Sequence, residues 1–99
     1  MNNQDVDKII CCEYQDLAKL ALSYVILTDK EQYIIELRIR RGMTQQEVAD
    51  YLSEKWDRDP DRLVSIPTIQ NWERSMYKKC SNVWDKVHWI HLLLKNIKP

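Results

Sequence analysis

Apolar and polar positions follow a helical period along most of the chain, and this pattern predicts an all-α protein. The segment DVDKIICCEYQDLAKLALSYVIL, residues 5–27, has a broad apolar face and contains neither glycine nor proline, so it predicts one N-terminal helix. Further helices are expected over about 28–41, 44–52, 65–79 and 82–97. The 99 residues therefore predict a single domain, a small bundle of about five helices with its core over about 28–79.

Local signals predict the ends of the central helices. Thr28 and Glu31 form one capping-box pattern, and Thr44 and Glu47 form a second, because each hydroxyl can accept from a backbone N–H and each glutamate can reach back. Gly42, the only glycine in the chain, lies between the two helices. It predicts a left-handed residue that ends the first helix and leaves a tight turn before the next.

The helix expected over 65–79 begins with Ser65 as a candidate N-cap and Pro67 in its first turn. Ile69, Trp72 and Met76 lie at i, i+3 and i+7, so we expect them to face inward. A helix, a tight turn, a short helix, a connection and a third helix together make a helix-turn-helix pattern.

These segments resemble a known group of bacterial transcription proteins. LTDKEQYIIELRIRRGMTQQEVADYL, followed by VSIPTIQNWERSMYKK, resembles region 4 of sigma factors. The same residues are similar to the lambda-repressor/Cro-like (XRE) family, through Gly-x-Thr-Gln-x-Glu-x-Ala and then Thr-Ile-x-x-Trp-Glu-Arg. The match covers roughly residues 27–79. The resemblance implies a transcription regulator of bacterial or phage origin that binds double-stranded DNA through the helix starting near Ser65.

The resemblance also implies roles for particular residues. Side chains on the recognition helix would approach base edges, where asparagine and glutamine suit adenine and arginine suits guanine; the candidates are Thr68, Gln70, Asn71 and Arg74. The start of the preceding helix would meet phosphates through Thr44, Gln45 and Gln46. The remaining expected DNA contacts are Arg40, Arg41, Ser65, Lys78 and Lys79. Ile66 could touch either a thymine methyl group or another protein.

One feature departs from the family pattern. The segment SEKWDRDPDRL, residues 53–63, lies between the second and third helices, which these families join through about three or four residues. Its acidic, proline-containing part predicts a loop. The extended turn leaves the orientation of the recognition helix undetermined by the resemblance.

The charge balance supports DNA binding only in part. The chain carries 15 basic and 15 acidic residues, so its net charge is zero. Residues 1–64 hold 9 Lys/Arg and 13 Asp/Glu, a balance of −4, and residues 65–99 hold 6 and 2, a balance of +4. The basic surplus therefore coincides with the expected recognition helix. The alternative interpretation is that these basic residues lie near helix C-termini because cations interact favourably with the helix dipole there.

Two partner classes remain open. The neutral charge, the acidic insertion and the apolar residues 82–97 also suit a sigma-region-4-like module that binds RNA polymerase or another protein. The apolar C-terminal helix predicts either the centre of a bundle or an interface, and the terminal helices are the expected seam of a homodimer. We expect no cofactor, no metal site and no enzymatic activity, because no catalytic motif is present. Three cysteines, the lack of a signal peptide and the lack of a long apolar run favour a cytoplasmic protein without membrane contact.

Overall fold

The computed structural model describes residues 1–55 and 64–97, and this part of the chain is helical with no β-strand. The predicted all-α bundle is confirmed, with six α-helices in place of about five. Their bounds are Asn3–Ile10 for α1, Gln15–Ser23 for α2, Asp29–Ile34 for α3, Gln45–Lys55 for α4, Ile66–Trp84 for α5 and His88–Asn96 for α6. A π-helical segment, η1, continues α3 over Ile35–Arg40.

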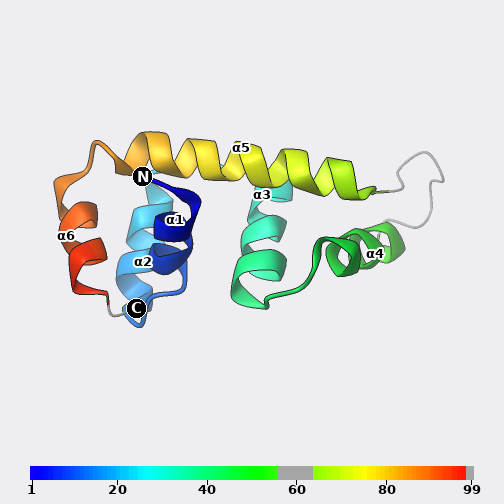
Figure 1. The fold of residues 1–99 in the computed structure, drawn as a ribbon, viewed down its shortest axis with the longest axis horizontal. Helices are drawn as coiled ribbons and strands as arrows, with labels where there is room; N and C mark the ends of the chain where they lie inside the picture. The colour runs from blue at the N-terminus through cyan, green and yellow to red at the C-terminus, as the bar shows by residue number, and fades with distance from the viewer. Residues whose placement is uncertain (56–63, 98–99) are drawn as a thin grey trace.

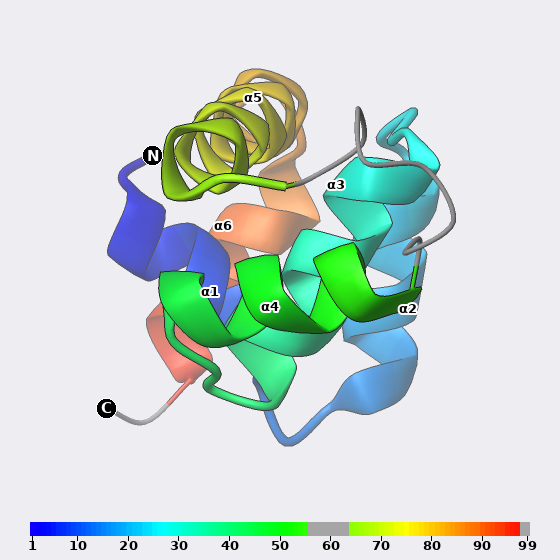
Figure 2. The same ribbon diagram turned by 90° about the vertical axis from the view of Figure 1, so that its right-hand side faces the viewer.

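The longest helix, α5, runs along most of the molecule (Figure 1). Helices α1, α2 and α6 lie together at its C-terminal end, and α3 and α4 lie along its first half. Figure 2 looks nearly along α5 and shows α4 crossing beneath it. Buried side chains from every helix join in one core, including Ile9, Ile34, Leu52, Ile69 and Trp84. No helix in the described residues has the length and apolar character needed to cross a membrane.

The prediction of one helix over 5–27 is wrong, because a turn at residues 11–14 divides it into α1 and α2. The buried positions are Val6, Ile9 and Ile10 in α1, and Ala18 and Ala21 in α2. On one continuous helix of 3.6 residues per turn these two groups would point in directions roughly 100° apart. The turn allows both groups to face the same core, so tertiary packing overrides local helical preference here.

The corner around Gly42 has the predicted geometry. The Thr28 box is complete, with Glu31 N donating to Thr28 Oγ1 at 3.2 Å and Thr28 N to Glu31 Oε1 at 2.9 Å. The Thr44 box is also complete, since Glu47 N donates to Thr44 Oγ1 and Thr44 N to Glu47 Oε1, both at 3.1 Å. Gly42 has a φ of 68°, in the left-handed region, and Met43 N across it donates to Leu37 O at 3.0 Å. Glycine adopts this conformation at little cost.

Replacing Gly42 with alanine should lower the free energy of unfolding by about 1 kcal/mol, the strain of a Cβ at positive φ. The space around the position is open, so backbone strain alone should decide the result. Urea denaturation would measure the loss. Gly42→Asn is the matched control, because asparagine tolerates the left-handed region better and should lose less. Equal losses in both variants would contradict the strain argument.

The two C-terminal helices have different bounds from those expected. Ser65 is the N-cap of α5, as predicted, but α5 continues to Trp84 instead of ending near Lys79. The prediction of a helix over 82–97 is therefore wrong in its first part, because a turn at 85–87 separates α5 from α6. Trp84 explains the extension: its side chain is fully buried and Nε1 donates to Ala21 O at 2.8 Å.

Helix α6 lies at one end of the molecule and is not the central helix of a bundle (Figure 1). Ile90 and Leu93 are buried, whereas Leu92 is 46% exposed. The first three residues of the insertion predicted at 53–63 belong to α4. Its acidic part lies outside the described residues.

Candidate nucleic-acid interface

The outer face of α5 is the first part of the candidate interface. Ile69, Met76, Cys80 and Trp84 turn inward and are fully buried, so the opposite side of the helix faces solvent. The exposed positions of α5 are Pro67, Gln70, Asn71, Arg74, Ser75, Lys78 and Asn82. None of them is acidic. The face therefore offers amides and two cations without a competing carboxylate.

Glu73 is the one acidic residue within α5, and its side chain is turned toward η1 and α4. Arg38 Nε donates to Glu73 Oε1 at 2.5 Å, and Arg38 Nη1 donates to Met43 O at 2.7 Å. Gln45 Nε2 donates to the other Glu73 oxygen at 3.1 Å, and Gln70 Nε2 donates to Gln45 Oε1 at 3.2 Å. This chain of contacts, the Glu73 network, joins η1 and the Gly42 turn to the first turn of α4 and the first half of α5.

The Glu73 network determines where the start of α4 lies. Because Gln45 binds both Gln70 and Glu73, the N-terminus of α4 is held beside the first half of α5. Gln46 points elsewhere and donates to Asp50 Oδ1 at 2.8 Å. Thr44 is engaged in its capping box. The backbone start of α4 and the outer face of α5 therefore lie next to each other.

The hydroxyl groups at the start of α5 contact each other. Ser65 Oγ and Thr68 Oγ1 are 2.9 Å apart, and Thr68 N donates to Ser65 Oγ at 3.4 Å. Farther along, Arg74 Nη1 donates to Asn71 Oδ1 at 3.4 Å. Ile66 is half-buried and Pro67 is exposed. The hydroxyl groups of the first turn of α5 are thus engaged in its own cap, and the exposed amides and cation begin at Gln70.

Lys79 lies beside this face but has an internal partner. Its Nζ donates to Glu31 Oε1 at 2.6 Å, and Ser75 Oγ donates to Glu31 Oε2 at 3.0 Å. Burial, which leaves Glu31 only 3% exposed, raises the pKa of this carboxyl, but the hydrogen bonds from Lys79, Thr28 and Ser75 outweigh it and the net pKa is lowered. Glu31 therefore stays ionised, and Lys79 joins α5 to the start of α3.

Arg40 and Arg41 lie apart from the outer face of α5. Arg40 Nη1 lies 3.7 Å from Glu36 Oε2, and Arg41 Nε lies 3.5 Å from Glu36 Oε1. The end of η1 lies on the side of the molecule away from α5 in both views (Figures 1 and 2). The structure thus brings Gln45, Gln70 and the rest of the α5 face together, and separates both arginines from them.

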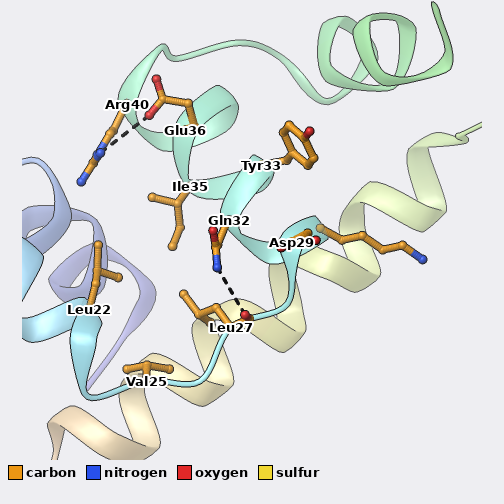
Figure 3. A pocket seen from close by; sticks show the side chains of 10 residues that line it. Leu22, Val25, Leu27, Asp29, Gln32, Tyr33, Ile35, Glu36 and Arg40 are labelled. Atoms are coloured by element: carbon orange, nitrogen blue, oxygen red, sulfur yellow. Dashed lines mark hydrogen bonds and ion pairs between the residues drawn. The ribbon is translucent and has the colours of Figure 1, made fainter. Parts of the chain in front are cut away.

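The arginine side of η1 borders an open groove of about 830 Å³, which sequence reasoning missed. Figure 3 shows Leu22, Val25 and Leu27 on one side, and Ile35 and Arg40 among the residues that face them from α3 and η1. The apolar period of residues 17–27 was visible in the sequence. The groove was not, because it depends on how α2 and α3 pack.

Sequence reasoning also missed the parts played by Arg38, Glu73 and Glu31. Arg38 was not among the expected contacts, and Glu31 was expected only as a capping residue. Their partners are 35 and 48 residues away in the chain, respectively Glu73 and Lys79. The available signal for Glu73 was that it is the one acidic residue in a helix whose other charged residues are basic.

Comparison of the chain with family models, with curated proteins and with solved structures finds no match.

Proposed function

We propose that this protein is a transcription regulator that binds double-stranded DNA, with α5 in the major groove. The observation that supports this most directly is the outer face of α5, which presents amides and cations and no exposed acid. Such a face suits the donor and acceptor pattern of base edges and the negative charge of phosphates.

In this proposal Gln70, Asn71 and Arg74 read base edges. Gln70 and Asn71 are exposed on adjacent positions, and Arg74 follows one turn later. Lys78, one further turn along, neutralises a phosphate. Thr68, close to the capped start of α5, would contribute through its methyl group, because its hydroxyl is shared with Ser65.

The backbone start of α4 would meet a neighbouring phosphate. Its free N–H groups and the positive end of its dipole favour an anion there. Gln45 and Gln46 lie at this start, although each amide already has an internal partner. Arg40, Arg41 and Lys79 would contribute less than the sequence suggested, because each of the three is paired with an acid of the same chain.

A second candidate function is a module that binds another protein, such as RNA polymerase. The observation that favours it is that Arg40 and Arg41 lie apart from the outer face of α5. The basic surface is therefore divided. A divided basic surface and a net charge of zero weaken the long-range attraction to DNA.

Binding to random duplex DNA at low and moderate salt separates these functions. Replacing Arg74 and Lys78 together with alanine should weaken binding about tenfold at low salt and reduce the salt slope by about 1, because Lys78 is the cation that faces a phosphate. The matched control is Lys8→Ala/Lys95→Ala, which removes the same charge from α1 and α6. Lys79 is kept, because its loss would leave Glu31 without its cation.

Salt-sensitive binding that the first variant weakens and the control leaves unchanged would support the DNA proposal. Equal losses in both variants would mean only non-specific attraction to positive charge. No binding at low salt by the folded protein would contradict the DNA proposal and favour the protein-binding module, which a polymerase pull-down would then test.

A further inference from the structure

Helix α2 exposes an apolar face that the chain itself leaves uncovered. Leu17, Leu20 and Tyr24 are 37%, 46% and 48% exposed, and their spacing of i, i+3 and i+7 places them on one side of the helix. Ala18 and Ala21 on the adjoining side are fully buried. Single exposed apolar residues are normal in a folded protein, but a contiguous group of them indicates an interaction surface.

The apolar face continues onto α6. The rings of Tyr24 and Trp89 contact each other with centroids 6.2 Å apart. Leu92, 46% exposed, follows Trp89 by about one turn of α6. We call this surface, formed by Leu17, Leu20, Tyr24, Trp89 and Leu92, the α2/α6 face.

The charges beside the α2/α6 face are self-complementary. Asp16 and Lys19 are both exposed on the same flank of α2, and neither forms an ion pair within residues 1–55 and 64–97. Consider a second copy whose α2 packs antiparallel on the first, with Leu17 of one copy opposite Leu20 of the other. Asp16 of one copy then lies within one helical turn of Lys19 of the other, on the same flank. The twofold axis creates the same pair a second time. A second copy of this chain therefore matches the face in both its apolar and its charged positions.

We propose that the protein forms a homodimer through the α2/α6 face, with the two α2 helices antiparallel across a twofold axis. The face lies at the end of the molecule away from the start of α5, so this dimer leaves Gln70, Asn71 and Arg74 uncovered (Figure 1). The proposal does not depend on DNA binding, because the dimer is measured without DNA.

Sedimentation equilibrium at micromolar concentration tests the dimer directly. The expected mass is twice the 12.0 kDa of the chain. Leu20→Glu should raise the dimer dissociation constant about 100-fold, because both copies lose a central apolar side chain. Tyr51→Glu is the matched control, since Tyr51 on α4 is 39% exposed and lies outside the face. Circular dichroism confirms that each variant is folded, which these exposed positions allow.

A charge exchange tests the antiparallel register. Asp16→Lys and Lys19→Asp should each weaken the dimer about tenfold, because each creates like charges across the axis twice. The double variant restores opposite charges and should recover most of the wild-type affinity. A monomeric wild type, a dimer that Leu20→Glu leaves intact, or a double variant as weak as the single ones would each overturn the proposal.

Discussion

Replacing Trp84 with alanine should lower the free energy of unfolding by about 4 kcal/mol, the typical cost of removing a buried tryptophan. The Trp84 side chain is fully buried, and its Nε1 donates to Ala21 O at 2.8 Å. The loss of this side chain leaves a cavity between the end of α5 and α2, and it removes one of two hydrogen bonds to Ala21 O, the other coming from Tyr24 N at 3.3 Å. Because domains of this size are stable by about 5–15 kcal/mol, the effect would be a large part of the total. Urea denaturation followed by circular dichroism measures it.

Two controls separate the parts of this effect. Trp84→Phe keeps much of the apolar volume but loses the donor to Ala21 O, so it should lower the free energy of unfolding by about 1–3 kcal/mol, less than the alanine variant. Tyr14→Ala removes a 48% exposed ring and should cost far less. If Trp84→Ala lost no more stability than Tyr14→Ala, the docking of α5 on α2 described above would be incorrect.

Replacing Glu31 with alanine should lower the free energy of unfolding by about 3 kcal/mol at neutral pH, because hydrogen bonds to a charged group contribute more than neutral ones. Glu31 accepts from Thr28, Ser75 and Lys79, so its loss frees α5 from the start of α3. Glu47→Ala is a matched control, since Glu47 occupies the same capping-box position but is exposed. It should cost about 1 kcal/mol.

The pH dependence of the Glu31 effect has a definite sign. The pKa of Glu31 is lower in the folded protein than its ordinary value of 4.5, so the unfolded chain binds more protons in the acid range. The stabilisation by Glu31 is therefore complete above pH 4.5 and is lost as the pH falls through the folded pKa. The difference in unfolding free energy between wild type and Glu31→Ala should shrink over that range.

Asp7 acts in the opposite direction and must be separated from this measurement. Burial raises the pKa of Asp7, and the hydrogen bond from the Tyr77 hydroxyl at 2.6 Å only partly offsets it. Ionising Asp7 therefore costs stability as the pH rises from its ordinary toward its raised pKa. The free energy of unfolding is measured against pH for wild type and for Glu31→Ala. The difference between the two removes the contribution of Asp7, because both proteins contain it. A difference that did not change with acidity would contradict the ionised Glu31.

Neighbouring residues were enough to predict the local features of the central helices. The two capping boxes, the N-cap at Ser65 and the positive φ of Gly42 were all predicted correctly. Each depends on residues at most four positions apart, so side-chain chemistry and backbone sterics decide it without the rest of the fold. The helical period likewise predicted that Ile69 and Met76 are buried in α5. It thereby predicted the exposed side that carries Gln70 and Arg74.

The breaks between helices and the pairing of charges depend on packing between distant segments. The turns at residues 11–14 and 85–87 contain no glycine or proline, and they exist because the helices on either side must turn their apolar faces to one core. The pairs Lys79–Glu31 and Arg38–Glu73 join residues far apart in the chain. The apolar period predicts which side of a helix is buried, but not which helices pack against it. An ion pair forms only where packing brings two charges within a few ångströms.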